Sequence, residues 1–168
     1  GAAGVARLHD YLRAYPDQVA LLVSVELCSL TLQRRDLSIP NLIATGLFGD
    51  GASCVVAVGT ERAASLDLGA GVAGPRVRAS KSRFYPNTES TMGWAVEDGG
   101  FRIILAADVP DLVDAHLGDD VAGFLAEQGV EREAVTSWVC HPGGPKVLRA
   151  FESALGLTEA DLALTWRS

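Results

Sequence analysis

Apolar residues recur along this chain with the spacing of helices in some stretches and of strands in others. Residues 1–15 place one helical face at Val5, Leu8, Leu12 and Tyr15, and Pro16 ends that helix. Residues 19–27 are apolar almost throughout, which predicts a strand covered on both faces. The same reasoning predicts strands at 52–58, 76–84, 92–96, 101–105 and 137–140, and helices at 36–47, 108–129 and 147–155.

Turn and capping residues set the expected bounds of the helices. Asp36 or Ser38 is expected to cap the helix at 36–47. Gly129 ends the helix at 108–129, which is either continuous or broken at Gly118. Pro145 suits the first position of the last long helix.

The connections between elements are equally marked. Residues 59–75 are rich in glycine and alanine and predict a loop or connector. The segment Glu97-Asp98-Gly99-Gly100 predicts the glycine turn of a hairpin between 92–96 and 101–105. Gly156 ends the helix before it, and Thr158 is expected to begin another.

The stretch 138–148 carries the clearest candidate chemistry. An apolar run ends in His141, a Pro-Gly-Gly-Pro loop follows, and a helical pattern then begins. This order predicts a buried strand, a tight turn and a helix, with His141 at the carboxyl end of the strand, where open α/β sheets collect their functional groups. A core histidine at the end of a strand is the alternative reading.

Three motifs in the same order give the chain a resemblance to a known family. They are Leu47-Phe48-Gly49-Asp50-Gly51-Ala52, Asp108-Val109-Pro110 and His-Pro-Gly-Gly-Pro at 141–145. Together they resemble the chalcone-synthase-like type III polyketide synthases of the thiolase superfamily, in a bacterial form. The resemblance implies an α/β fold of the thiolase-like αβαβα layered type, incomplete because the amino-terminal part and the carboxyl-terminal end are missing.

The resemblance also implies a division of the chain and a reaction. Residues 1–60 correspond to the rest of the amino-terminal half after the nucleophile, and 61–168 to a connector and the first part of the carboxyl-terminal half. The implied reaction is an acyl transfer, the decarboxylative Claisen condensation of malonyl-CoA onto an acyl-CoA starter. His141 is the implied catalytic residue, while the nucleophilic cysteine and an oxyanion-binding asparagine fall outside the chain, so the chain alone is expected to be inactive.

Several residues match positions where the family binds its substrates. Phe48 matches a gate between the cofactor tunnel and the acyl cavity, and Gly143 and Gly144 are expected to let the pantetheine arm pass. The cavity itself is expected to be lined at Cys28, Thr31, Phe101 and Ile103. For Cys28 and Thr31, ordinary small-residue packing is an equal alternative.

Ile103 bears on the product. It falls where chalcone-forming members carry a second gate phenylalanine, and a smaller aliphatic gate leaves room for a flexible alkyl starter. The resemblance therefore favours an alkylpyrone or alkylresorcinol over a tetrahydroxynaphthalene or a chalcone. This inference depends on the strand register, because a one-residue slip moves the side chain to the other face.

Composition limits the partners. A net charge of −7 argues against general affinity for nucleic acid or anionic membranes, and no apolar run approaches the ~20 residues that span a bilayer. The three cysteines have no metal-ligand spacing, so no metal is expected, and they fit a reducing cytoplasm. By resemblance, no cofactor is held, coenzyme A thioesters are the substrates, and the full protein is a homodimer.

Two charged features have bland interpretations that are favoured. The basic run Arg76, Arg78, Lys81 and Arg83 is expected to be a solvated strand face rather than a site for cofactor phosphates. Asp50 is expected to order the turn of its motif through backbone hydrogen bonds rather than to perform chemistry. His116 is assigned no role.

Two other classes of protein remain open. A relative of 3-oxoacyl-acyl-carrier-protein synthase III would share the chemistry but use a carrier protein, and the Pro-Gly-Gly-Pro loop favours the polyketide branch. A non-catalytic domain would keep the fold and lack the nucleophile. The chain opens and closes inside apparent motifs and is interpreted as a piece of a longer protein. The residues encoded just before Gly1 therefore distinguish the non-catalytic domain, which would have no cysteine there, from an active synthase.

Overall fold

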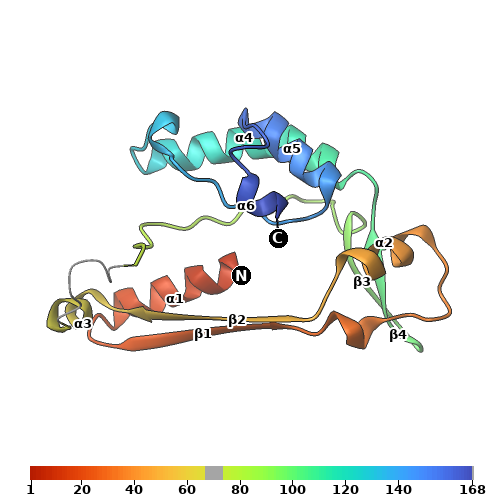
Figure 1. Ribbon diagram of the computed structural model, residues 1–168, viewed down its shortest axis with the longest axis horizontal. Coiled ribbons are helices and arrows are strands. Elements are labelled where there is room, and N and C mark those ends of the chain that lie inside the picture. Colours follow the sequence, from red (N-terminus) through yellow and green to blue (C-terminus); the bar gives the residue numbers. More distant parts are fainter. Residues whose placement is uncertain (67–73, 168) are drawn as a thin grey trace. The chain divides into compact units, whose positions relative to one another are not determined.

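A computed structural model describes residues 1–66 and 74–167 (Figure 1). Its α-helices are α1 (Ala2–Ala14), α2 (Ile39–Leu47), α3 (Thr60–Ser65), α4 (Val109–Glu127), α5 (Pro145–Leu155) and α6 (Ala163–Trp166). Two short 3-10 helices are η1 (Cys28–Thr31) and η2 (Arg132–Ala134). The strands are β1 (Val19–Glu26), β2 (Gly51–Val58), β3 (Met92–Glu97) and β4 (Gly100–Leu105).

The described residues form two compact units. The first contains 1–29, 49–66 and 74–82, and the second contains 30–48 and 83–167. Each unit holds one antiparallel pair of strands, β1 with β2 in the first and β3 with β4 in the second.

In the first unit, α1 packs against one face of the β1–β2 pair. The strands pair over their whole length, from Val19 opposite Val58 to Glu26 opposite Gly51. Gly4 allows the helix to approach closely, because a Cβ atom at this position would lie 2.9 Å from Leu22 Cδ1. The strands at 19–27 and 52–58 are confirmed.

The other face of β1 is open, so the prediction that both faces are covered is wrong for this chain. Side chains there alternate with those that face α1. The exposed fractions are 50% for Val19, 61% for Leu21, 57% for Val23 and 57% for Val25. A single helix layer covers only one face of a strand pair.

The connector after β2 contains structure that the sequence did not predict. Residues of the expected loop at 59–75 form α3, and positions 67–73 of that prediction lie outside the described residues. The amides of Glu61 and Arg62 both donate to the Pro16 carbonyl oxygen at 3.0 Å. This carbonyl satisfies the first free amides of the short helix, a tertiary partner that local sequence does not reveal.

In the second unit, α2 contacts the hairpin strand β4, and the predicted hairpin is confirmed. Ser38 is the cap of α2, since its hydroxyl oxygen accepts from the Asn41 amide at 3.5 Å. Asp36 supports this cap, because its carboxylate accepts from the Ser38 amide at 2.9 Å. The buried Asn41 side chain donates to the carbonyl oxygens of Gln33 and Asp36, at 3.1 and 2.7 Å, and fixes the loop before the helix.

Helices α4 and α5 pack together, and α4 runs unbroken through Gly118. A Cβ atom at Gly118 would lie 2.8 Å from the Ala154 carbonyl oxygen on α5. Of the two alternatives, the continuous helix is the one observed, and the glycine permits a close approach of the two helices. The ends agree better with expectation: Gly129, with φ of 61°, follows α4, and Gly156, with φ of 58°, ends α5.

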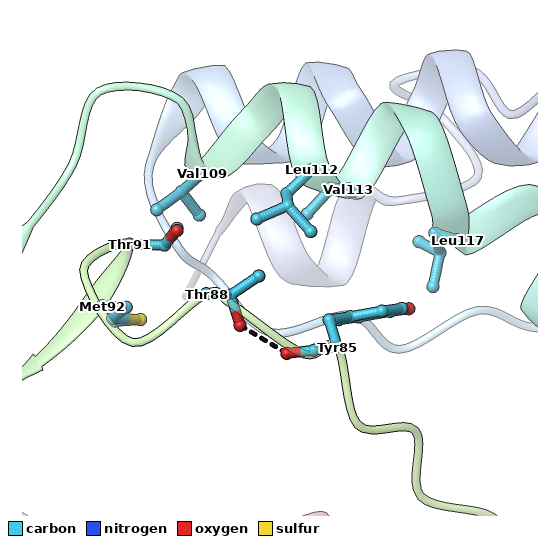
Figure 2. A pocket seen from close by; sticks show the side chains of 8 residues that line it. All are labelled: Tyr85, Thr88, Thr91, Met92, Val109, Leu112, Val113 and Leu117. Atoms are coloured by element: carbon cyan, nitrogen blue, oxygen red, sulfur yellow. Dashed lines mark hydrogen bonds between the residues drawn. The ribbon is translucent and has the colours of Figure 1, made fainter.

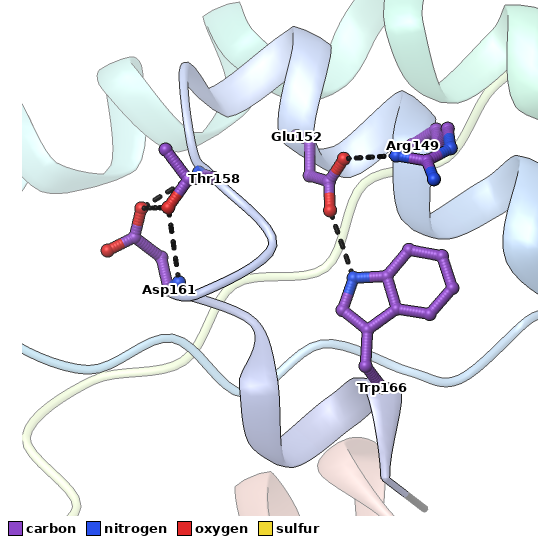
Figure 3. Close-up of polar contacts among 5 residues, drawn as sticks. All are labelled: Arg149, Glu152, Thr158, Asp161 and Trp166. Carbon is purple, nitrogen blue, oxygen red and sulfur yellow. Dashed lines mark hydrogen bonds and ion pairs between the residues drawn. The ribbon is translucent and has the colours of Figure 1, made fainter.

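Thr158 opens a turn rather than a helix. Its amide and its hydroxyl both donate to Asp161 Oδ2, at 2.8 and 2.7 Å, as in a helix cap (Figure 3). The helix that follows, α6, begins later, at Ala163, after the fully buried Leu162.

Two predicted strands, at 76–84 and 137–140, are wrong. Both segments carry neither helix nor strand in the structure. Val139, expected in a buried strand, is 82% exposed. A strand requires a hydrogen-bonded neighbour, and within the described part of the chain neither segment pairs with another strand.

Candidate functional site

His141 is exposed and is followed at once by a reversal of the chain. Its carbonyl oxygen accepts from the Gly143 amide at 2.8 Å, which closes a three-residue turn around Pro142. Proline suits the centre of such a turn because its ring fixes φ near −65°. The turn ends the extended segment immediately after the histidine.

Gly144 joins this loop to α5 and places it beside α2. Its φ of 94° and ψ of 163° lie where residues with a side chain are strained. A Cβ atom on Gly144 would lie 3.5 Å from Leu47 Cδ1, in van der Waals contact. Leu47 is the last residue of α2 and precedes Phe48, so the structure brings the histidine loop beside the start of the Leu-Phe-Gly-Asp-Gly-Ala motif.

The segment before His141 is tied to the carboxyl-terminal end of the second unit. The Cys140 amide donates to Thr165 Oγ1 at 3.3 Å, and Thr165 is buried, with 4% exposed. Burial raises the pKa of the Cys140 thiol. This cysteine is therefore a poor source of thiolate, although it adjoins His141 in the sequence.

Arg132 supports the same segment from η2. Its guanidinium lies 4.9 Å from the centre of the Trp138 ring and also donates to the Leu155 carbonyl oxygen at the end of α5. A cation over an indole face and a satisfied helix end both favour this arrangement.

A second polar cluster ties α6 to α5 (Figure 3). Trp166 Nε1 donates to Glu152 Oε1 at 2.9 Å, and the Arg149 guanidinium lies 5.4 Å from the Trp166 ring centre. Arg149 and Glu152 also form an ion pair at 3.4 Å. Neither this cluster nor Arg132 was singled out from the sequence, because no local pattern marks contacts between residues so far apart.

The hairpin displays the two predicted cavity residues of β4 on one face. Phe101 pairs with Val96 and Ile103 with Trp94, and residues two apart share a face. Ile103 is buried, whereas Phe101 is about half exposed and meets the Trp94 ring edge-on at 6.2 Å. Since the expectation for Ile103 depended on register, this pairing gives the face on which it lies.

The other predicted cavity residues belong to both units. Cys28 opens η1 at the end of the first unit, while Thr31 closes η1 and lies in the second. Phe48 caps the carboxyl end of α2, also in the second unit. All three are half-buried. The structure thus describes Thr31, Phe48 and the hairpin residues within one unit and Cys28 in the other.

Asp50 acts as a structural group, as expected, but through a different partner. Its carboxylate accepts from the Ser29 amide at 2.7 Å and from the Ser29 hydroxyl at 2.6 Å. These two hydrogen bonds, the one from the hydroxyl first, lower the pKa of Asp50. Instead of ordering only its own turn, Asp50 connects the start of β2 to the residue that follows the end of β1 by three positions.

The second unit also contains a pocket of about 320 Å³ beside α4 (Figure 2). The helix contributes four apolar side chains to its wall, and the segment before and into β3 contributes the rest. Its lining residues are Tyr85, Thr88, Thr91, Met92, Val109, Leu112, Val113 and Leu117. No residue predicted from the sequence to bind substrate is among them.

Within 1–66 and 74–167, no group of three His, Cys, Asp or Glu side chains could hold a metal ion. In the same part of the chain, no helix combines the length and apolarity needed to cross a bilayer. Most of the basic run at 76–83 is exposed on extended backbone, while Arg83 pairs with Asp120.

Comparison with known families extends the argument from single motifs to most of the second unit. Residues 76–168 match the family described as chalcone and stilbene synthases, C-terminal domain. The chain belongs to the chalcone and stilbene synthase family. This is the polyketide branch that the His-Pro-Gly-Gly-Pro loop favours over the carrier-protein-dependent synthases.

Individual members of the family show how far the similarity extends. A 1,3,6,8-tetrahydroxynaphthalene synthase of Streptomyces peucetius subsp. caesius is 51% identical over 100% of this chain and 43% of its own length. An alpha-pyrone synthesis polyketide synthase-like protein of Mycobacterium tuberculosis is 30% identical over 94% of this chain and 39% of its own length. The chain thus spans less than half the length of these curated relatives.

A solved structure confirms the fold. The 1,3,6,8-tetrahydroxynaphthalene synthase of Streptomyces coelicolor, a bacterial type III polyketide synthase, is 30% identical, with a TM-score of 0.83 over 96% of this chain and 43% of that one. The polyketide synthase of the brown alga Ectocarpus siliculosus gives the same TM-score at 25% identity. The predicted thiolase-like α/β fold, present only in part, is confirmed for this chalcone and stilbene synthase relative.

Gly144→Ala tests the backbone of the histidine loop. A side chain at this φ is expected to cost about 1–3 kcal/mol of folding free energy, measured by urea unfolding. Gly46→Ala, near the carboxyl end of α2 with no atom within 4 Å of the new Cβ, is the matched control. The control is expected to be neutral or slightly stabilising, so equal losses in both variants would contradict the loop geometry.

Asp50 predicts a specific pH dependence. Because its pKa in the fold lies below the ordinary 3.8, the ionised carboxylate stabilises the fold at neutral pH, and this contribution disappears as pH falls through the folded-state value. Asp50→Asn is therefore expected to reduce stability between about pH 5 and 8, with the gap to wild type closing below about pH 4. In a Ser29→Ala background, the effect of Asp50→Asn on the free energy of unfolding is expected to be smaller. An effect of Asp50→Asn that persists unchanged in acid would refute the role of ionisation.

Proposed function

We propose that this chain is part of a type III polyketide synthase, an acyltransferase that extends an acyl-CoA starter with malonyl-CoA. In each cycle the bond between the malonyl carboxylate and its α-carbon breaks, CO₂ leaves, and the electron pair remains as an enolate. The enolate attacks the thioester carbonyl of an acyl group held on a cysteine. A carbon–carbon bond forms, and the cysteine thiolate leaves. The nucleophilic cysteine of the enzyme and an asparagine oxyanion donor are assigned to parts of the protein outside this chain.

His141 is the catalytic residue assigned within the chain. Its imidazole donates an N–H to the developing oxyanions, and its nearness to the cysteine favours the thiolate. The observation that supports this role best is the loop itself. An exposed histidine stands at a tight turn, and Gly144, which follows the turn, lies beside Leu47, next to the proposed gate Phe48.

Gly143 and Gly144 are the proposed passage for the pantetheine arm. Gly144 has a backbone conformation that only glycine adopts at little cost. The absence of a side chain there keeps this side of the loop narrow. Phe48 is the proposed gate of the acyl cavity, and Cys28, Thr31, Phe101 and Ile103 are its proposed walls. We expect the full protein to be a cytoplasmic homodimer, to hold no cofactor, and to need regions beyond this chain for activity.

The aliphatic Ile103, buried on the hairpin, supports an alkylpyrone or alkylresorcinol as the product. A tetrahydroxynaphthalene is the second candidate, favoured by the similarity to the synthase of Streptomyces peucetius. The two differ in their carbon sources. A tetrahydroxynaphthalene has no alkyl side chain, so malonyl-CoA alone can supply its carbon, whereas an alkylpyrone needs an acyl-CoA starter.

Incubating the full-length protein with malonyl-CoA, with and without a series of straight-chain acyl-CoAs, distinguishes the products by mass spectrometry. We expect alkylpyrones or alkylresorcinols whose mass follows the starter. Formation of tetrahydroxynaphthalene from malonyl-CoA alone, with no starter-dependent product, would favour the second candidate. Absence of any condensation would favour a non-catalytic domain, and sequencing upstream of Gly1 would then test for the missing cysteine.

His141→Ala in the full-length protein tests the catalytic assignment. Loss of one oxyanion donor typically lowers kcat by about 10²–10³-fold, and loss of the imidazole partner of the thiolate adds to it. Malonyl-CoA decarboxylation and condensation are expected to fall together, with an unchanged circular dichroism spectrum. His9→Ala, the same change on α1, is the control. Wild-type turnover in the His141 variant would remove this residue from the mechanism.

A further inference from the structure

A cluster of polar side chains holds the segment before β3 against the middle of α4. Arg83 Nε donates to Asp120 Oδ1 at 2.6 Å, and the Tyr85 hydroxyl donates to Asp120 Oδ2. The Tyr85 ring also stacks on His116, one turn earlier on α4, with ring centres 4.9 Å apart and planes 22° apart. Both carboxylate oxygens of Asp120 are thus engaged, and only 14% of its side chain is exposed.

The electrostatics of the cluster favour one arrangement of charge. The hydrogen bond from Tyr85, and then the Arg83 guanidinium, lower the pKa of Asp120. The same hydrogen bond raises the pKa of Tyr85. The proton therefore stays on the phenol and the charge on the carboxylate, which is the state that binds both partners at once.

From Tyr85 a continuous series of hydrogen bonds leads to the open end of the hairpin. Thr88 Oγ1 donates to the Tyr85 carbonyl oxygen at 2.7 Å, as Figure 2 shows. The Thr91 amide donates to the Thr88 carbonyl oxygen at 3.0 Å, and the Ala106 amide donates to the Thr91 carbonyl oxygen at 2.9 Å. Thr91 precedes β3 and Ala106 follows β4, so the series connects Asp120 to both strands where the hairpin begins.

The turn of the hairpin is fixed separately. Gln33 Nε2 donates to the carbonyl oxygens of Gly99 and Phe101, both at 3.1 Å. Gln33 is itself held by the buried Asn41 of α2. The hairpin is therefore fastened at its turn to the loop before α2 and at its base to α4.

Packing alone does not fix the base, because the 320 Å³ pocket lies there. Tyr85 and Met92, the first residue of β3, both line it, opposite Val109 and Leu112 of α4. The pocket is open to solvent at Met92, whose side chain is about half exposed. With room for Met92 to move, the polar contacts of Asp120 become the constraint on the base of the hairpin.

We propose that Asp120 is a positioning residue: by holding Arg83 and Tyr85 it sets how hairpin β3–β4 presents Phe101 and Ile103, and thereby selects the length of acyl chain that is accepted. This inference rests on the proposed function for its substrate, but the contacts of Asp120 can be tested without it. Asp120 lies on α4 and touches no residue assigned to the chemistry. Its loss changes selection among starters, not the decarboxylation of malonyl-CoA.

The first test measures amide hydrogen exchange in the full-length protein, with Asp120→Asn and the milder Tyr85→Phe. Because both variants lose a hydrogen bond of the charged Asp120 carboxylate, exchange at Thr91 and Ala106 is expected to become about 10–100-fold faster. Asp119→Asn, an exposed neighbour on the same helix, is the matched control and is expected to leave exchange unchanged. Equal exchange in the Asp120 and Asp119 variants would overturn the proposal, whether or not the protein is active.

The second test measures kcat and KM for a series of acyl-CoA starters. Asp120→Asn and Tyr85→Phe are expected to change KM by about tenfold or more, by different factors for short and long chains, with kcat for malonyl-CoA decarboxylation kept within about twofold. Faster exchange with an unchanged starter profile would overturn the role in selection. A wild-type protein that condenses no starter would refute the proposed function, while the exchange result would still decide whether Asp120 holds the hairpin.

Discussion

The hydrogen bond from the Cys140 amide to the buried Thr165 hydroxyl is the contact on which the proposed active site depends. The segment that carries His141 has no strand neighbour among the described residues, so no sheet holds it in place. Its position comes instead from the helical end of the unit. Thr165 binds the backbone one residue before His141, and Arg132 lies over Trp138 three residues before it. Glu152 and Trp166 in turn fasten α6 to α5, so a histidine at the surface is positioned by contacts on the opposite side of its own loop.

The chemistry of Cys140 fits this arrangement. Cys140 adjoins the proposed catalytic histidine in sequence, yet its burial and its raised pKa keep it protonated. In the proposed mechanism the imidazole of His141 acts on a different sulfur, and the raised pKa of Cys140 keeps this thiol out of the reaction. Partial burial of the Cys140 side chain raises its pKa, while its backbone amide donates to Thr165.

Local signals in the sequence predicted much of the fold, and long-range partners account for the rest. Ser38 marks a helix start through its side-chain hydroxyl, and Pro145 and Gly156 mark helix ends through their backbone preferences. The glycine turn marks the hairpin, and all four are where the sequence placed them. The sequence left open whether Gly118 breaks its helix, because the close approach of the Ala154 carbonyl, 36 positions away in the chain, has no local signal. The strands at 76–84 and 137–140 failed for the same reason, since a strand exists only with a neighbour. For the site, motifs predicted His141, Gly144 and Phe48, and their roles stay predictions, whereas the contacts of Arg132, Thr165 and Asp120 become visible only in three dimensions. The division into halves at residue 60 stays a prediction.

The open valine face of β1 has a practical consequence for anyone who handles this polypeptide by itself. Val19, Leu21, Val23 and Val25 form a row of aliphatic side chains along the strand. The last three are each more than half exposed. Identical rows on separate molecules match one another in spacing, and this geometry nucleates aggregates with β-sheet structure. Preparations of this stretch will therefore stay clear only when dilute, and turbidity, not loss of helix, will be the first sign that they are failing.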